Sequence, residues 1–553
     1  MGNIDRKAFC PVRNRVSNGV CVAATLLMAG FICGCPGQFK LGRGAKELAP
    51  QTEMGATIGS LVEVVVPQSI PVEGYGLVGG LNGTGSSECP PRIRAYLTRY
   101  ILSQLPGQKI DVEKLIDSPN TAVVLVEGVM PSIPLKGQYL DVKVTALEGT
   151  RTTSLQGGWL YGADLNVAGS FGIAMKVMVD AEGPVFIDKI DTAEANKRVG
   201  YILAGGKVLD DFKIALVVRK PDYRGTSNIR NRVNELFGGD IARAVSPGRI
   251  EVTVPDKYRE QKEKFVSLIK ATYLAQTPQV TEERVKAFVT RLAVSQDKDA
   301  SEIALEAIGN ESLSKLGVLL NSSDQQVRLR AARCMLNLGS DAGLDVLRKM
   351  AIEKGSACRL EALEAIVVGA SRNDAVAVSR RLLYDEDFDI SLAAYEQLRK
   401  LEDVAITREF IGRNFYLERI AQTGHKAIFV SRSGQPRIVI FGLPIRCRGN
   451  IYVKSADGNV IINAPAGQKD VTLLRKQPRR SGVIARMKSS FELADIIRTL
   501  CEEPAGKNEE ARRGLGISYD EMIALLKQMC DRGAVKADFL AGPLPKIGLT
   551  IKK

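Results

Sequence analysis

The chain has 553 residues, of which 45% are hydrophobic and 25% charged, and its formal net charge is +14. This length exceeds one ordinary core and predicts roughly three or four domains. The composition is that of a folded globular protein and excludes bulk disorder. A basic balance suits an anionic partner such as nucleic acid, cell-wall polymer or an acidic protein. Because no block of lysine and arginine alternates with aromatic residues, we expect no nucleic-acid partner.

The N-terminus carries the pattern of an export signal. A basic stretch ending at Arg15 precedes mostly apolar residues from Val20 to Ile32. This run is shorter than the about 20 residues that a membrane span needs, and it is typical of a signal-peptide core. It leads to Cys35 in a context that resembles the lipobox of bacterial lipoproteins. We expect residues 1–34 to be removed and the Cys35 thiol to carry a lipid. An ordinary cleaved signal is the alternative, and both predict export.

Six cysteines lie beyond Cys35, and their spacing contains no CxxC pair and no zinc pattern. Two of them, Cys334 and Cys358, fall within helical apolar patterns and are expected to be buried thiols. Because an exported compartment permits disulfides, a bridge among Cys447, Cys501 and Cys530 is left open.

The residues after the signal divide into a tether and a mixed region. Residues 35–58 are rich in Gly, Pro, Gln and Lys and are expected to form a tether. Residues 59–275 alternate strand and helix patterns, which predicts an α+β region. Strands are predicted at 61–66, 122–127, 140–145 and 250–255, and helices at 92–104 and 228–237.

Residues 276–415 have an all-helical pattern with an internal repeat. Four segments align, at offsets of 27, 31 and 32 residues, and share a small residue that would let helices approach closely. These residues are Ala304, Ala331, Ala362 and Ala394. The period resembles HEAT-type helical pairs stacked as a short solenoid, and an ordinary helical bundle is the alternative.

Residues 416–553 are expected to be rich in β-structure and to end in a helix. Strands are predicted at 438–441, 451–454 and 459–462, with Asp457-Gly458 as a hairpin turn between the last two. Ser518 and Glu521 have the spacing of a capping box that begins the last helix.

A basic stretch interrupts this C-terminal region. Its members are Arg475, Lys476, Arg479, Arg480, Arg486 and Lys488. The first four are our candidates for contact with an anionic surface, and the alternative is a solvated loop.

The glycine-rich run Gly74–Gly85 resembles the signature near the start of mature flagellar P-ring proteins. It lacks the Gly-Lys-Ser/Thr ending of a phosphate-binding loop, and glycine there would serve tight turns and close backbone approach in a structural loop. Further segments match in the family's order: Asn120–Val126, Leu140–Val144, Ser154–Leu160, Lys220–Tyr223, Ala242–Val245 and Gly248–Pro255. Near the C-terminus, Gly516–Val535 resembles the family's last helix.

This resemblance implies a P-ring-like α+β region, residues 59–275, and a P-ring-like C-terminal region, residues 416–553, separated by inserted helical repeats. It implies a structural subunit of the flagellar basal-body P ring, a closed periplasmic ring around the rod that supports rotation and motility. The implied partners are further copies of the chain and the rod and L-ring proteins, with peptidoglycan as a further candidate, and no cofactor or metal is implied.

Two features depart from the family and lead to a second hypothesis. P-ring proteins carry an ordinary cleavable signal and no helical insertion, whereas here a lipid at Cys35 would add the membrane as a partner. Pro36 follows the cysteine in place of Asp, which favours the outer membrane over the inner. The alternative function is an envelope lipoprotein that acts as a scaffold or binding module of a non-flagellar machine.

Catalysis is not expected. The chain has one histidine, His425, and no G-x-S-x-G elbow, so a histidine-based triad or a histidine-rich metal site has no support. A cell-wall glycosidase with two carboxylates is the one enzyme class that the sequence leaves open.

Overall fold

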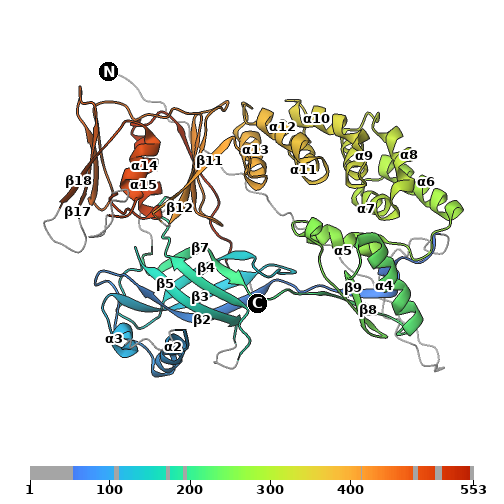
Figure 1. Cartoon of the computed structure of the whole chain (residues 1–553), viewed down its shortest axis with the longest axis horizontal. Helices are drawn as coiled ribbons and strands as arrows, with labels where there is room; N and C mark the ends of the chain where they lie inside the picture. The colour runs from blue at the N-terminus through green and yellow to red at the C-terminus, as the bar shows by residue number, and fades with distance from the viewer. Residues whose placement is uncertain are drawn as a thin grey trace, which may run out of the picture. The chain divides into compact units, whose positions relative to one another are not determined.

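The computed structural model describes residues 54–104, 111–169, 175–190, 196–412, 414–476, 484–504 and 514–547. These residues belong to one compact unit, Thr52–Lys553. Within it the chain forms a barrel, a small sheet covered by helices, a stack of helices and a C-terminal module with two sheets (Figure 1). The expected multidomain α+β architecture is therefore present.

The barrel is closed by antiparallel strands in the order β2-β3-β4-β7-β6-β5, as far as the described residues show. The strands are β2 (Ile70–Gly79), β3 (Thr121–Met130), β4 (Tyr139–Ala146), β5 (Trp159–Val167), β6 (Val179–Pro184) and β7 (Val199–Val208). Alternate residues point inwards, so apolar side chains such as Val124 and Val142 fill the interior. The strands predicted at 122–127 and 140–145 are thereby confirmed.

Two helices lie against the outer face of the barrel, α2 (Pro91–Gln104) and α3 (Val112–Ile116). Leu97 of α2 and the end of α3 pack on Leu77 and neighbouring outward-facing residues. Figure 1 shows both helices beside β2. The helix predicted at 92–104 is confirmed.

The first half of the glycine-rich run is strand, so the prediction of a loop was wrong for that half. Gly74 and Gly79 lie in β2, whereas Gly80 and Gly83 adopt left-handed turn conformations with φ of 81° and 84°. A Cβ atom at Gly74 would lie 2.2 Å from the carbonyl oxygen of Asp164. Glycine is required there because β2 and β5 cross at a distance that leaves no room for a side chain.

A second module combines residues from before and after the barrel. Its antiparallel sheet has the order β1-β8-β10-β9 among the described residues. The strands are β1 (Val62–Val65), β8 (Ile214–Val218), β9 (Ala242–Ser246) and β10 (Arg249–Val252), and the helices are α1 (Ile58–Leu61), α4 (Tyr223–Phe237) and α5 (Lys262–Ala271), with a 3-10 turn at Asp256–Tyr258. Because β1 pairs with β8, the barrel is inserted between them.

Two boundaries in this module differ from the predictions. Ile58 was assigned to the tether, but it is fully buried in α1 and belongs to the core under the sheet. The helix predicted at 228–237 begins earlier, at Tyr223, because the Asp222 carboxylate accepts a hydrogen bond of 2.7 Å from the Gly225 N–H and caps it.

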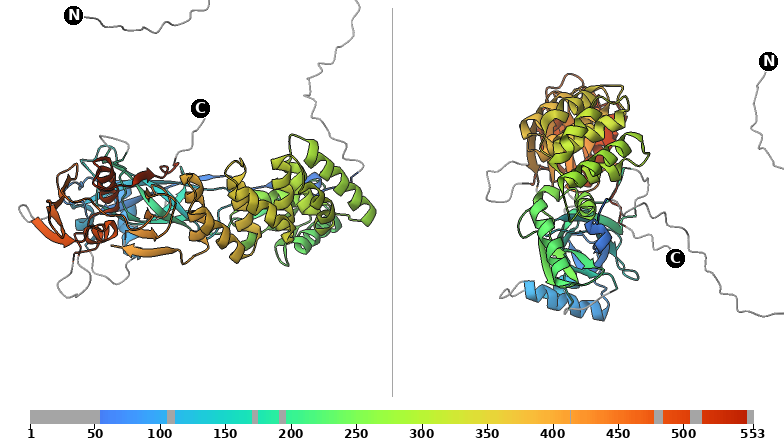
Figure 2. Two further views of the ribbon diagram at one scale, coloured as in Figure 1. Left: turned by 90° about the horizontal axis from the view of Figure 1, so that it is seen from above. Right: turned by 90° about the vertical axis from the view of Figure 1, so that its right-hand side faces the viewer.

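Residues 278–400 are helical apart from short turns, as predicted (Figures 1 and 2). The helices are α6 (Pro278–Val294), α7 (Asp299–Ile308), α8 (Leu313–Leu319), α9 (Gln325–Asn337), α10 (Leu344–Ile352), α11 (Arg359–Gly369), α12 (Arg372–Leu382) and α13 (Phe388–Lys400), with 3-10 turns at Asn310–Ser312 and Asp341–Gly343. The four aligned alanines lie in α7, α9, α11 and α13 and are buried. The helical region ends earlier than the predicted residue 415, because residues from Ile406 onward form a strand.

Buried ion pairs join the helices to each other and to the following sheet. Glu302 in α7 is 4% exposed, and its carboxylate lies 2.6 Å from Arg333 Nε. Glu418, which is fully buried in the next module, accepts hydrogen bonds from Arg399 (3.2 Å) and Arg408 (2.8 Å). Loss of one partner would leave an uncompensated buried charge, so these pairs specify how the elements pack.

The C-terminal module contains two sheets. Their orders among the described residues are β11-β12-β14-β13-β19 and β15-β16-β17-β18. The strands are β11 (Ile406–Ile411), β12 (Phe415–Ile420), β13 (Ala427–Val430), β14 (Arg437–Phe441), β15 (Ile451–Lys454), β16 (Val460–Ala464), β17 (Val471–Lys476), β18 (Ile484–Ser489) and β19 (Asp538–Ala541), and the helices are α14 (Leu493–Cys501) and α15 (Tyr519–Asp531). Both helices share one apolar core with the two sheets and lie between them (Figure 1).

The predicted turn at Asp457-Gly458 is confirmed, but the predicted capping box is not. Gly458 has a φ of 72° and joins the paired strands β15 and β16. Ser518 is the N-cap of α15, yet its hydroxyl donates to Asp520 and not to the backbone of the first turn. Glu521 instead accepts a hydrogen bond of 3.1 Å from Gln156 Nε2 in the segment that leads into β5. Tertiary contact therefore replaces the local cap.

The six described cysteines are all free thiols. Cys334 and Cys358 are buried, as predicted, and the structure contains no bridge among Cys447, Cys501 and Cys530. Burial raises the pKa of Cys447 to about 12 and that of Cys530 to about 11, so both thiols are protonated at neutral pH.

Candidate functional site

Only part of the predicted contact site can be placed. Cys35, Arg479 and Arg480 lie outside the described residues. Arg475 and Lys476 form the end of β17, and β17 pairs with β18 as an antiparallel hairpin. The first two and the last two members of the basic stretch therefore lie on the paired strands β17 and β18.

The two placed candidates have different surroundings. The Arg475 side chain is only 18% exposed, and its guanidinium donates to the carbonyl oxygens of Leu515 and Gly516 and lies 3.8 Å from the Glu521 carboxylate. Arg475 thus stabilises the approach to α15. Lys476 is exposed, and so are Arg486 and Lys488 on β18. An external anionic contact at this hairpin would fall on these exposed residues.

The barrel and the C-terminal module meet through polar contacts that the sequence did not indicate. Asp141 at the start of β4 accepts hydrogen bonds from the Ser433 hydroxyl (2.7 Å) and the Gly434 N–H (3.0 Å). Lys189 Nζ lies 2.7 Å from the carboxylate of Asp520, which is 2% exposed. Isolated Asp and Lys residues carry no sequence pattern, so only the fold could identify this pair.

Apolar residues continue the same junction. Phe186, Ile190 and Leu203 of the barrel region belong to one buried cluster with Phe415 and Tyr519 of the C-terminal module. The Phe186 and Tyr519 rings lie 5.9 Å apart between centroids. The two modules therefore share a core, which restricts their relative motion more than a purely polar contact would.

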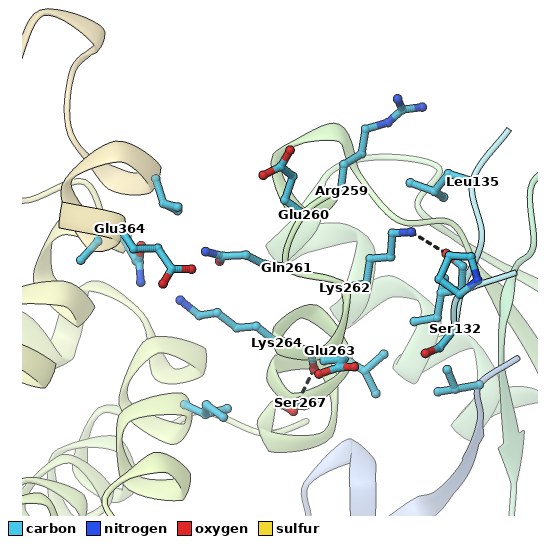
Figure 3. A pocket seen from close by; sticks show the side chains of 18 of the residues that line it. Ser132, Leu135, Arg259, Glu260, Gln261, Lys262, Glu263, Lys264, Ser267 and Glu364 are labelled. Atoms are coloured by element: carbon cyan, nitrogen blue, oxygen red, sulfur yellow. Dashed lines mark hydrogen bonds between the residues drawn. The ribbon is translucent and has the colours of Figure 1, made fainter. Parts of the chain in front are cut away.

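A groove of about 1240 Å³ lies where α5 faces the helical stack. Lys262 Nζ donates to the Ile133 carbonyl oxygen (2.7 Å), and Lys264 Nζ lies 2.8 Å from Glu306. Figure 3 shows Glu364 on the stack side, facing Gln261 and Lys264. Burial lowers the pKa of Lys262. The two lysines thus form contacts within the protein that connect the small-sheet module to the barrel and to the helical stack. The described residues of the groove do not place a nucleophile beside a base.

The residues described do not assemble a metal centre. Among them, no three His, Cys, Asp or Glu side chains converge as a metal-binding group. His425 is partly exposed, and its Nε2 contacts the Glu386 carbonyl oxygen. No helix in the described ranges is long and apolar enough to cross a membrane.

Comparison with known proteins concerns the barrel and the small sheet. Residues 57–290, which contain both, match the family model of the flagellar P-ring protein. The matched segment begins just before α1 and ends within α6.

Alignments with individual P-ring proteins cover a similar share of the chain. The chain is 31% identical to the flagellar P-ring protein of Thermotoga maritima over 210 residues, which is 35% of this chain and 60% of that protein. It is 27% identical to that of Campylobacter lari over 237 residues (40% and 64%) and 31% identical to that of Anaeromyxobacter dehalogenans over 229 residues (38% and 58%). The chain thus spans about 60% of the length of these curated relatives. The likeness proposed for Gly516–Val535 lies outside the matched segment and stays a prediction.

Proposed function

We propose that this chain is a structural subunit of a flagellar basal-body P ring, located in the periplasm around the rod, and that it is not an enzyme. The observation that carries the proposal is the match of residues 57–290 to the flagellar P-ring protein family. The motifs that resemble the family occur in the same order within that segment. They build the barrel and the sheet into which the barrel is inserted.

The geometry supports a role that depends on shape. A closed ring needs two different surfaces of each subunit to meet at a fixed angle. Modules joined by a shared core and by buried pairs such as Lys189–Asp520 can hold such an angle. The proposed partners are further copies of the chain and rod and L-ring proteins, with peptidoglycan as a further candidate, and the role requires no cofactor and no nucleic acid.

The helical stack is proposed to be a HEAT-like insertion. Its alternate helices α7, α9, α11 and α13 carry the buried alanines that allow close packing. Stacks of this kind expose extended surfaces that bind proteins or brace a larger fold. In a P ring, this insertion would add a further surface for contact with other proteins.

A lipid anchor at Cys35 is proposed to tether the protein to the outer membrane. Cys35 is the last residue of the lipobox-like sequence Ile32–Cys35 and stands where the lipid-bearing cysteine is expected, whereas Cys33 precedes it. We expect Cys35→Ser to abolish labelling with a fatty-acid analogue and to leave an unprocessed precursor on gels. If Cys35→Ser is processed normally and the wild-type protein carries no lipid, the anchor is refuted. Export would then depend on an ordinary cleaved signal.

The alternative function is an envelope lipoprotein that scaffolds a non-flagellar machine. It is favoured by the helical stack and by the coverage of only about 60% of the curated relatives. Deletion of the gene separates the two hypotheses. Loss of swimming, restored by the plasmid-borne gene, supports the P ring, whereas normal swimming with an altered envelope supports the alternative.

A further inference from the structure

The first described residues, 54–58, connect two separate apolar cores. Met54 packs against the cluster of the helical stack, to which Phe288 and Val289 also belong. Ile58 is fully buried in the cluster of the small-sheet module. We call residues 54–58 the strap, because they are too few to form a core of their own and contribute a side chain to each of two others.

Backbone hydrogen bonds hold the strap against the segment that follows α5. The Ile58 N–H donates to the Thr272 carbonyl oxygen (2.8 Å), and the Leu274 N–H donates to the Ala56 carbonyl oxygen (3.4 Å). The two segments run antiparallel at this point. Because an isolated pair of short strands is at best marginally stable in water, the strap needs further support.

Arg284 of α6 supplies that support from a buried position, since it is only 3% exposed. Its Nε donates to the Met54 carbonyl oxygen (2.7 Å), and its Nη1 donates to the Ala275 carbonyl oxygen (2.9 Å). The guanidinium carbon lies 3.8 Å from the centroid of the Tyr273 ring, within the range of a cation–π contact. One side chain thus joins the strap to its partner segment and to the stack, and the strap helps to compensate a buried charge.

A glycine allows the strap to pass close to this guanidinium. Gly55 has a φ of 81°, and a Cβ atom there would lie 2.7 Å from Arg284 Nη2. The guanidinium could move aside only by losing the two carbonyl oxygens and the ring that hold it. The strap and Arg284 therefore fit together only while residue 55 has no side chain.

We propose that the strap connects the N-terminal tether to the joint between the small-sheet module and the helical stack, and that Arg284 holds it in place. When the Arg284 contacts are lost, the strap detaches and this joint loosens. The tether precedes Met54 in the sequence, so a pull through a lipid at Cys35 reaches the fold at the strap. Only this last step rests on the lipid anchor proposed above, and no step depends on the ring.

Hydrogen exchange of the full mature chain, followed by mass spectrometry, tests the strap. We expect Arg284→Met to increase the exchange rates of the Ile58 and Leu274 amides at least about tenfold, because hydrogen bonds to a charged group are lost. Arg291→Met is the matched control. Arg291 lies in the same helix but is exposed and contacts only the Phe288 ring, at 5.6 Å, so both amides should exchange as in the wild type.

A second variant disturbs the same contact from the strap. Gly55→Ala should also accelerate exchange of the two amides, and the double variant should exchange within about twofold of the faster single variant, because both changes remove one interaction. Gly339→Ala is the control, since Gly339 has a similar φ of 82° but open space around a Cβ atom. Effects of Arg284→Met and Gly55→Ala that multiply would contradict a shared contact.

Magnetic tweezers attached through tags at the two ends of the unlipidated mature chain test the transmission of a pull. We expect Arg284→Met to lower the force of the first unfolding step and Arg291→Met to leave it unchanged. Because this chain carries no lipid, the result is independent of whether Cys35 is lipidated in the cell.

Two outcomes would overturn the inference at different steps. Unchanged exchange of the Ile58 and Leu274 amides in a folded Arg284→Met variant would overturn the role of Arg284. Faster exchange with an unchanged first-step force would overturn only the transmission of a pull. Far-UV circular dichroism establishes that each variant is folded. If Arg284→Met does not fold, Arg284→Lys replaces it with the same expected direction, because one ammonium group cannot reproduce the planar fork that reaches both carbonyl oxygens.

Discussion

At the residue scale, glycines in β2 determine how closely β2 and β5 can approach. A Cβ atom at Gly74 would lie 2.2 Å from a backbone oxygen of β5, and one at Gly79 would lie 2.6 Å from the Tyr161 ring. The backbone oxygen cannot move away without shifting a strand, whereas the Tyr161 side chain is 47% exposed and can rotate, so the constraint is stronger at Gly74. This is a steric reason for glycine in the run that resembles the P-ring signature.

Replacement of Gly74 should therefore destabilise the barrel. We expect Gly74→Ala to cost about 1–3 kcal/mol, because the added methyl forces the strands apart. Gly239→Ala is the control, since a Cβ atom there has open space, and it should change stability by less than about 0.5 kcal/mol. Urea unfolding followed by fluorescence of Trp159, the single tryptophan, reports on β5. Equal midpoints for the two variants would contradict the steric argument.

Asp164 predicts a pH dependence of stability. Burial and then the charge of Asp180 raise its pKa above the ordinary value of 3.8. The folded state thus binds the proton more readily than the unfolded state, so this contribution is fully present below about pH 4 and is lost as pH rises through the raised pKa. Asp164→Asn should flatten the dependence on pH and raise stability at pH 7 relative to the wild type. Parallel pH profiles of the urea midpoint for the two proteins would contradict this.

At the scale of elements, the helical stack is the part whose local patterns agree best with its structure. The buried alanines of α7, α9, α11 and α13 recur at the predicted positions, and ion pairs such as Arg333 with Glu302 connect neighbouring helices. Each helix thus packs mainly on helices close to it in sequence. A unit with such local contacts is expected to fold on its own.

A fragment of residues 276–404 tests this independence. It ends before β11, which pairs with β12 and would be left without its partner. We expect a soluble monomer with strong helical circular dichroism. A longer fragment ending at residue 412 is the control, since it adds the unpaired strand and should aggregate more readily. A mainly β or disordered spectrum for the shorter fragment would refute an autonomous stack.

At the scale of the whole molecule, the contacts between modules would set the geometry of a ring subunit. Asp141 links the barrel to the C-terminal module, Lys264 links the small-sheet module to the helical stack, and Glu418 links the stack to the C-terminal module. Ring assembly would add contacts on the remaining surface, and the basic hairpin β17–β18 is our candidate for an anionic rod or wall surface.

Electron microscopy of the purified mature protein, alone and with rod proteins, tests the ring. We expect large, uniform annular particles. Changing Arg479 and Arg480 to Glu should weaken rod binding most at low salt, because exposed charges are screened over about 10 Å at 0.1 M salt. Lys315 and Lys349 changed to Glu make a control with the same change of charge on the exposed stack. Monomers under all conditions, with normal swimming of a deletion strain, would refute the ring, whereas rod binding unaffected by the Arg changes would refute only the hairpin contact.

Sequence patterns by themselves determined the elements that depend on residues close together in the chain. The strands β3, β4, β15 and β16, the helix α2, the turn at Asp457-Gly458 and the buried alanines were all predicted, because periodicity and turn chemistry act within about a dozen residues. The ordered motifs between Gly74 and Pro255 likewise indicated the segment that matches the P-ring family model.

Only the tertiary structure decided which distant residues meet. The barrel closes and is inserted between β1 and β8. Arg475 donates to the backbone just before α15, and Glu521 accepts from Gln156 in place of forming the expected cap. The fold also places Asp164 opposite Asp180. Such pairings depend on strand register and on the packing of modules far apart in the chain, and a polar side chain binds whichever partner that packing brings within reach.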